Sequence, residues 1–306
     1  MIRALVTGGC GFIGSNLVDK LIELEYDVTV IDDMSSGKLE NINSLAKYLF
    51  GDFKEILANG GSLLAKIGVD IDVVFHLGAE ARIQPSFEDP LYTCENNSLG
   101  TAVVCEFART YGCKIVYAGS SSFYGGVYLN PYAFAKWQGE EVCKMYSEVY
   151  EVNTGIARFF NVYGPRNPLI GQYTPVVAIF EEQYKNSDCL TIVGDGEQRR
   201  DFTHVSDICT GLIAISQGDW SGDVFNLGTG TNHSINELAD MFGMEKKYLE
   251  ARPGEARETL ADISKTTEQT GWAPQHNLGE YIKGGLKCPH TKIHTVKEIQ
   301  ERTWRI

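Results

Sequence analysis

The chain has 306 residues, of which 43% are hydrophobic and 22% are charged, as is usual for a globular protein. Its formal net charge of −13 argues against a surface that binds nucleic acid or an anionic membrane. No apolar stretch approaches the length of a bilayer-spanning helix. An anionic small molecule would therefore need local cationic groups in an acidic protein.

The first predicted element is a buried parallel strand over Ile2–Val6, followed at once by a glycine-rich turn. Helical spacing then continues over Ser15–Leu24. A strand, a glycine turn and a helix let backbone N–H groups at the helix N-terminus approach a pyrophosphate closely. The turn reads Thr7-Gly8-Gly9-Cys10-Gly11-Phe12-Ile13-Gly14, and it predicts a dinucleotide site. The alternative is an ordinary tight turn.

The second predicted strand, over Asp27–Ile31, ends in Asp32. An acidic side chain at this place accepts hydrogen bonds from the ribose hydroxyls of the adenosine and repels a 2′-phosphate. The sequence therefore predicts NAD rather than NADP as the cofactor.

Strands and helices continue to alternate through the first half of the chain. The further predicted strands are Tyr48–Gly51, Asp72–Leu77, Lys114–Gly119 and Thr154–Phe160, and the predicted helices are Lys54–Ile67, Asp89–Tyr111 and Pro131–Tyr150. Apolar strands that alternate with helices indicate an α/β fold, a Rossmann-like doubly wound parallel sheet.

After about residue 160 the pattern changes to short strands, loops and shorter helices. We expect an NAD-binding domain over 1–160, a smaller α/β substrate-binding lobe over 161–288, and a C-terminal tail over 289–306 with one weak helical pattern. The chain is expected to cross between the two lobes more than once.

Eight cysteines lie scattered, without a CxxC pair, and favour free thiols in a reducing compartment. Because the N-terminus enters a strand at once, we expect no signal peptide and a cytoplasmic protein. The histidines lack metal-ligand spacing, so no metal site is expected.

Tyr132 and Lys136 open the helix that follows Pro131, and their spacing of four places them on one helical face. An ammonium beside a phenol favours the phenolate, so we expect a lowered pKa for Tyr132 and proton exchange with a sugar or alcohol oxygen. The preceding strand ends in Ser120-Ser121-Ser122, where a hydroxyl can bond to the same oxygen. The alternatives are a surface tyrosine beside a solvated lysine, and serines that only cap a turn.

These segments resemble the extended short-chain dehydrogenase/reductase superfamily, and within its NAD-dependent epimerases and dehydratases most closely the UDP-hexose 4-epimerases. The resemblance covers roughly residues 1 to 287. Besides the segments above it rests on Ile31-Asp32-Asp33-Met34-Ser35-Ser36-Gly37, Gly51-Asp52, His76-Leu77-Gly78-Ala79, Arg158-Phe159-Phe160-Asn161-Val162-Tyr163-Gly164-Pro165-Arg166, Gly194-Asp195-Gly196-Glu197-Gln198-Arg199-Arg200-Asp201-Phe202 and Phe225-Asn226-Leu227-Gly228.

The resemblance implies a role for each matching residue. The catalytic residues would be Ser120, Tyr132 and Lys136, with Ser121 and Ser122 as fallback choices for the hydroxyl. NAD would be held by Gly8, Gly11, Phe12, Ile13, Gly14, Asp32, Asp33, Ser36, Gly37, Asp52, Phe53, Leu77, Ala79, Tyr132 and Lys136, with Asp52 near the adenine. The substrate would contact Asn97, Ser120, Asn161, Arg200, Arg252, Glu255 and Thr259.

Among these residues, Asn161, Arg200 and Arg252 would hold the nucleotide diphosphate, and arginine suits phosphate because it offers paired donors. A small residue at Thr259 would admit N-acetylated sugars, unless this threonine simply begins a strand. The resemblance also implies a homodimer that pairs the helices over 89–111 and 131–150.

The predicted activity is that of an NAD-dependent nucleotide-sugar 4-epimerase, acting on UDP-Glc/UDP-Gal, UDP-GlcNAc/UDP-GalNAc or both through a transient 4-keto sugar. Dehydration needs a carboxyl acid near C6, and no carboxylate occurs between Lys114 and Gly139. The alternatives are a reductase or another epimerase on the same scaffold, and a non-catalytic NAD-binding regulator.

Two departures from the family pattern bear on the site. The segment between Tyr124 and Pro131 is roughly a dozen residues shorter than is usual, so it could open the sugar pocket or displace Tyr132. Glu80 stands where a neutral residue is common and adds a negative charge near the nicotinamide end.

Overall fold

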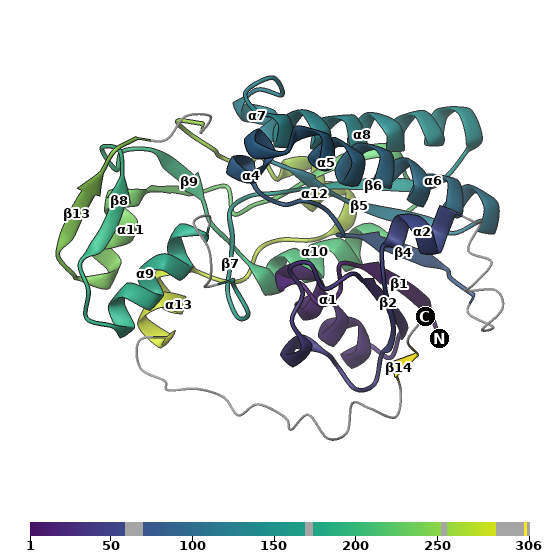
Figure 1. The fold of residues 1–306 in the computed structure, drawn as a ribbon, viewed down its shortest axis with the longest axis horizontal. Coiled ribbons are helices and arrows are strands. Elements are labelled where there is room, and N and C mark those ends of the chain that lie inside the picture. Colours follow the sequence, from purple (N-terminus) through teal and green to yellow (C-terminus); the bar gives the residue numbers. More distant parts are fainter. Residues whose placement is uncertain (59–69, 169–173, 252–255, 286–302, 305–306) are drawn as a thin grey trace.

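The computed structural model describes residues 1–58, 70–168, 174–251, 256–285 and 303–304. Its main feature is a parallel sheet with the strand order β11-β6-β5-β4-β1-β2-β3-β14 (Figure 1). The strands are β1 Arg3–Thr7, β2 Asp27–Asp32, β3 Lys47–Phe50, β4 Val73–His76, β5 Lys114–Ser120, β6 Thr154–Phe159, β11 Ser221–Leu227 and β14 Thr303–Trp304.

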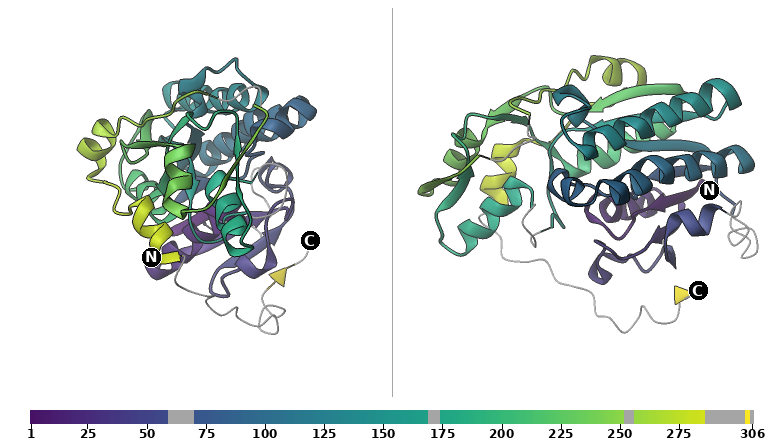
Figure 2. Two further views of the ribbon diagram at one scale, coloured as in Figure 1. Left: turned by 90° about the vertical axis from the view of Figure 1, so that its left-hand side faces the viewer. Right: turned by 45° about the horizontal axis from the view of Figure 1, so that its top comes forward.

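Helices cover both faces of this sheet, which confirms the predicted doubly wound fold (Figures 1 and 2). Alternate side chains of a strand point to opposite faces, so Ala4 and Val6 of β1 enter one core cluster and Leu5 enters another. The helices on the first face are α1 Phe12–Glu23 and α10 Val205–Ser216, and those on the second are α2 Phe53–Ala58, α6 Gly100–Tyr111 and α8 Pro131–Tyr150.

The helix predicted over Asp89–Tyr111 is present, with an irregular middle. It consists of α5 Pro90–Cys94, a π-helical turn over Glu95–Leu99, and α6. Asp89 caps α5 by accepting a hydrogen bond from the Tyr92 amide at 2.9 Å. Of the helix predicted over Lys54–Ile67, the described part is α2, and residues 59–69 lie outside the described ranges.

The second lobe lies at one end of the sheet, beyond β7 Val162–Tyr163 (Figure 1). Its own core contains the side chains of Phe180, Ile192, Leu238 and Phe242, all buried. The lobe includes α9 Val176–Lys185, β8 Leu190–Val193, β9 Arg199–Asp201, β12 Asn232–Ser234, α11 Ile235–Phe242, β13 Lys246–Leu249 and α13 Leu278–Gly285.

The chain returns from this lobe to the main sheet. Strand β11 pairs with β6, and α10 packs on the face that α1 also covers. The link is made by β7 Val162–Tyr163, which pairs with β10 Thr203–His204 directly before α10. Residues 205–227 therefore complete the sheet although they follow the start of the lobe. Helix α12 Ser264–Thr270 lies beside β11.

At the far edge, Thr303 and Trp304 of the tail form β14 parallel to β3. The rest of the tail, with its weak helical pattern, lies outside the described ranges. Among the residues that the structure describes, no helix is both long and apolar enough to cross a bilayer.

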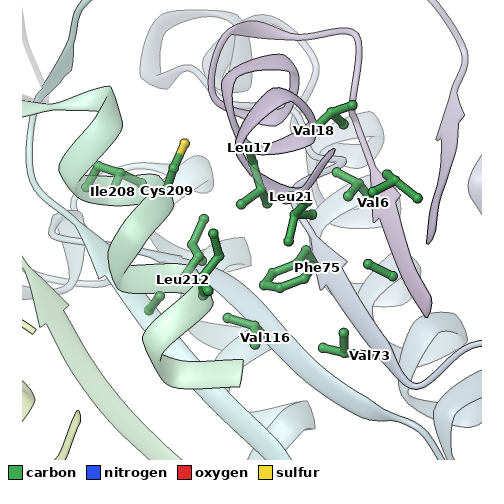
Figure 3. Packing of buried hydrophobic residues seen from close by; sticks show 14 of the residues in the cluster. Val6, Leu17, Val18, Leu21, Val73, Phe75, Val116, Ile208, Cys209 and Leu212 are labelled. Carbon is green, nitrogen blue, oxygen red and sulfur yellow. The ribbon is translucent and has the colours of Figure 1, made fainter. Parts of the chain in front are cut away.

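The packing between α1, α10 and the sheet predicts a large cost for shortening Leu212. This side chain is fully buried between Leu21, Phe75 and Val116 (Figure 3). We expect Leu212→Ala to lower the free energy of unfolding by about 2–5 kcal/mol, because it removes apolar contacts and leaves a cavity. Urea denaturation followed by circular dichroism measures the change.

The matched control for this experiment is Leu39→Ala, since the Leu39 side chain is 60% exposed. A surface truncation of this kind is expected to change the free energy of unfolding by less than about 0.5 kcal/mol. Equal effects of the two substitutions would contradict the packing described here.

Candidate active site

The glycine turn that joins β1 to α1 leaves no room for a side chain at Gly8 or Gly14. Gly8 has a φ of +72°, and a Cβ atom there would lie 2.9 Å from the Gly78 nitrogen. A Cβ atom on Gly14 would collide with the carbonyl oxygen of Gly8. Helix α1 begins at Phe12 without a side-chain cap, so its first-turn N–H groups have no side-chain acceptor from Gly11. Such an N-terminus suits a pyrophosphate.

Asp32 at the end of β2 is buried and already binds two backbone amides. The Cys10 amide donates to its Oδ2 atom and the Met34 amide donates to its Oδ1 atom, each at 2.8 Å. Burial raises the pKa of this carboxyl, and the two amides oppose that effect. Each carboxylate oxygen keeps a second lone pair, so Asp32 can still accept ribose hydroxyls.

A central cavity of about 710 Å³ starts at this turn and extends into the second lobe. It is lined by residues at the carboxyl ends of β1, β2, β4, β5 and β6, where ligands bind in open α/β sheets. Among the described residues its basic lining side chains are Lys38, Arg82, Lys136, Arg166 and Arg200, and its acidic ones are Asp32, Asp33 and Glu80. The cavity is thus more basic than the acidic chain as a whole.

Most of the predicted site residues share this cavity. Those that line it are Gly8, Gly11, Phe12, Ile13, Gly14, Asp32, Asp33, Ser36, Phe53, Leu77, Ala79, Ser120, Tyr132, Lys136, Asn161, Arg200 and Thr259. Arg252 and Glu255 lie outside the described residues.

Three predicted residues do not line the cavity. Each contacts another residue of the protein instead. Asn97 is buried and exchanges two 2.8 Å hydrogen bonds with the backbone of Glu80. Asp52 accepts a hydrogen bond from the Lys54 amide and forms an ion pair with the Lys54 ammonium at 3.1 Å. Gly37 packs behind Asp32, where a Cβ atom would lie 2.7 Å from a carboxylate oxygen.

Tyr132 and Ser120 meet in the cavity although the segment between Tyr124 and Pro131 is short. Asn130 caps α8 by accepting a 2.7 Å hydrogen bond from the Ala133 amide, which sets the start of the helix and the place of Tyr132. Burial raises the pKa of Tyr132, and a hydrogen bond with Ser120 opposes this rise. The Ser122 hydroxyl donates to Ser120 Oγ at 2.9 Å, so Ser122 supports Ser120.

The prediction that the pKa of Tyr132 is lowered is wrong for the protein without a bound ligand, because this pKa is raised. Burial raises this pKa, the negative charge of Glu80 raises it further, and the Ser120 contact opposes both effects. The Lys136 ammonium lies 4.7 Å from the centre of the Tyr117 ring. Burial lowers the pKa of Lys136 to about 8, against the opposing effect of Glu140.

At the second lobe the cavity ends near Arg200, Asn161 and Thr259. The Arg200 Nη1 atom donates to the Arg199 carbonyl at 2.9 Å, which holds the side chain along β9. The Asn161 amide donates to Thr259 Oγ1 at 3.1 Å. The Thr259 side chain is therefore both a lining group and a hydrogen-bond acceptor.

The sequence patterns indicated no role for Lys38 or Arg82, and they marked Arg166 only as the last residue of a family motif. Lys38 and Arg82 stand in loops without a motif, so only the fold reveals them. Arg166 follows the Asn161–Pro165 motif and forms an ion pair with Asp19 at 2.6 Å. Glu80 lines the cavity, and burial raises the pKa of its carboxyl.

The buried histidines have structural contacts. His76 accepts or donates hydrogen bonds with Thr7 at 2.8 Å and Thr101 at 3.3 Å, and burial lowers its pKa to about 3. His204 stacks on His276 and accepts a hydrogen bond from the Ser206 amide. Within the described ranges, no three His, Cys, Asp or Glu side chains are placed to hold a metal ion.

Comparison with known proteins agrees with this geometry. The NAD dependent epimerase/dehydratase family matches residues 4–228. A putative UDP-glucose 4-epimerase of Methanocaldococcus jannaschii is 37% identical over 304 residues, which covers 91% of this chain and 95% of that protein. UDP-glucuronic acid decarboxylase 6 of Arabidopsis thaliana is 31% identical, over 91% of this chain and 86% of that protein.

A similar solved structure is that of the UDP-N-acetylglucosamine 4-epimerase from Methanobrevibacter ruminantium M1 in complex with UDP-N-acetylmuramic acid. It superposes with a TM-score of 0.85 at 32% identity and covers 94% of this chain and 97% of that one. The glycine turn, the Ser120–Tyr132 contact and these likenesses together place the chain in the NAD dependent epimerase/dehydratase family.

Proposed function

We propose that this protein is an NAD-dependent UDP-sugar 4-epimerase. The observation that carries the proposal is the meeting of Tyr132 and Ser120 in one cavity with Lys136. On one side this cavity reaches the glycine turn, and on the other it reaches Arg200 and Thr259. A dinucleotide and a nucleotide sugar would thus meet at the phenol.

The lining residues fit NAD. The uncapped start of α1 and the close backbone approach at Gly8 would hold the pyrophosphate, and Asp32 would accept the adenosine ribose hydroxyls. When bound, NAD accepts and returns a hydride at the sugar carbon. Tyr132 would take the proton of the 4-hydroxyl and give it back, while Ser120 bonds to the same oxygen. The positive charge of Lys136 would favour the phenolate.

The sugar pair is proposed from Thr259. A threonine leaves room that a bulky side chain would fill, so we propose that UDP-GlcNAc/UDP-GalNAc are used as well as UDP-Glc/UDP-Gal. Because some relatives are decarboxylases, the reaction has to be identified by experiment. Glu80 bears on this question, because its half-buried carboxyl lines the cavity and its charge acts on Tyr132.

Incubation with UDP-Glc, UDP-GlcNAc, UDP-GlcA and their C4 epimers, without added reductant, tests the proposal. Equilibration of one pair, followed by chromatography, supports it and identifies the sugar. Turnover only with added NADPH identifies a reductase. Loss of water or of carbon dioxide identifies a dehydratase or a decarboxylase, and bound NAD without turnover identifies a non-catalytic protein.

We further propose a homodimer in which a second copy packs on the outer faces of α6 and α8. These adjacent helices leave Tyr111, Met145 and Val149 at least 42% exposed, although all three are large and apolar. Light scattering of the purified protein is expected to give twice the mass of the 33.9 kDa chain. A measured mass of one chain would contradict the proposed dimer.

The cytoplasmic location stays a prediction.

The first kinetic prediction concerns the phenol. We expect Tyr132→Phe to lower kcat by about 10²–10⁴-fold, because the proton of the 4-hydroxyl loses its acceptor. The NAD content of the purified variant, measured by chromatography after denaturation, should stay that of the wild type. The matched control is Tyr128→Phe, since Tyr128 is 83% exposed. Retained turnover in Tyr132→Phe would remove Tyr132 from its role.

The second kinetic prediction concerns the sugar gate. We expect Thr259→Tyr to lower kcat/KM for UDP-GlcNAc by about tenfold or more relative to UDP-Glc, because the ring fills space beside the N-acetyl group. Thr259→Ser is the control, since it keeps the hydroxyl that Asn161 binds. An unchanged ratio of the two kcat/KM values in Thr259→Tyr would refute the assignment.

A further inference from the structure

Helix α8 continues the row of Tyr132 and Lys136 with a third polar residue, Glu140. The spacing of four residues places all three side chains on one face. Lys136 is 5% exposed and Glu140 is 1% exposed. A buried carboxylate one turn beyond a buried ammonium is costly unless it is paired, so its partner is informative.

The partner of Glu140 is Arg158 on β6. Arg158 Nε lies 3.0 and 3.2 Å from the two carboxylate oxygens, and Nη2 lies 2.6 Å from Oε2. Arg158 is paired in register with Gly119 of β5, and a Cβ atom on Gly119 would lie 2.9 Å from Glu140 Oε1. The carboxylate therefore occupies space that a side chain would take directly before Ser120.

Arg158 also supports the turn that follows Ser120. Its guanidinium carbon lies 3.5 Å from the centre of the Phe123 ring and 5.1 Å from that of Tyr124. The Tyr124 hydroxyl donates to the side chain of Asn226 at 2.9 Å. The Glu140–Arg158 pair thus connects the helix that carries Tyr132 and Lys136 with the turn that follows Ser120.

The other titratable groups that face Lys136 are uncharged near neutral pH. On β4, burial lowers the pKa of His76 to about 3. Burial raises the pKa of Tyr117 on β5 and of Cys143 on α8 well above their usual values, and raises that of Tyr132 as well. Within the described part of the chain, Glu140 is the charged group that acts on the Lys136 ammonium.

We propose that Glu140, held in place by Arg158, is a positioning residue that keeps the buried Lys136 ammonium charged beside Tyr132. The inference rests on the proposed function, because the charge of Lys136 matters for a phenol that exchanges protons. Arg158 has two tasks in this arrangement. It compensates the buried carboxylate, and it holds that carboxylate against Gly119, the residue before Ser120.

The test removes both charges, because Glu140→Gln alone would leave the Arg158 cation buried and unpaired. The double variant Glu140→Gln/Arg158→Met does so, and Glu140→Gln/Arg158→Gln is a second version that keeps polar groups. The matched control is Glu141→Gln, since Glu141 is the next residue along the helix and lies half-exposed in an ion pair with Lys144.

The first readout needs no enzymatic activity. Acetic anhydride acetylates only the neutral amine, and mass spectrometry of the Lys136 peptide across a pH series gives the midpoint of its titration. We expect this midpoint to fall by about one pH unit in the folded double variants and to stay unchanged in Glu141→Gln. The peptide that carries the exposed Lys247 is the internal standard, since none of these substitutions changes a residue near it. An unchanged Lys136 midpoint, or failure of both double variants to fold, overturns the proposed role.

The second readout is the pH profile of epimerisation. The high-pH limb of kcat is expected to move toward lower pH by the same amount in the double variants. In the single variant Glu140→Asp, which keeps both charges, it should stay where it is in the wild type. A purely structural pair would lower kcat equally at every pH. If the wild type epimerises none of the sugars, the proposed function fails, while the acetylation series still decides whether Glu140 governs Lys136.

Discussion

The backbones of β1 and α1 approach each other so closely at Gly8 and Gly14 that no side chain fits between them. This contact fixes where α1 begins, and with it the direction of its first N–H groups. It also brings Gly78, from the end of β4, against the same turn. One side of the cavity is therefore lined in part by the backbone of Gly8, Gly14 and Gly78, and its shape depends on the absence of side chains at these positions.

The cavity also concentrates positive charge in an acidic protein. Its basic side chains come from loops and strand ends that are distant in the sequence, and Arg166 is in addition paired with Asp19 of α1. Because the anionic ligand is drawn to a basic interior, the acidic exterior can keep the protein soluble without opposing binding. The acidic Asp32 also lines this cavity, and two backbone amides donate hydrogen bonds to its carboxylate and so stabilise its negative charge.

The parts that sequence could predict are those in which chemistry follows from neighbouring residues. The glycine turn, the acidic end of β2, and the spacing of Tyr132 and Lys136 are local patterns, and the structure brings all of them to one cavity. The pKa of Tyr132 was mispredicted because it depends on burial and on Glu80, which comes from another strand end. Asn97 was expected near the substrate, but the π-helical turn aims its amide at the backbone of Glu80. Arg82 had no local pattern at all.

The return of β11 to the sheet has a consequence for how the molecule can be divided. Phe225 and Leu227 of β11, together with α10, complete a core whose other buried members, apart from Trp272, precede residue 160. A fragment that stopped there would expose the open edge of β6 and the apolar side of the sheet, both of which invite aggregation. The second lobe is therefore built from two segments, one between β6 and β11 and one after β11, so replacing it as a unit would require both of its connections to the sheet to be kept.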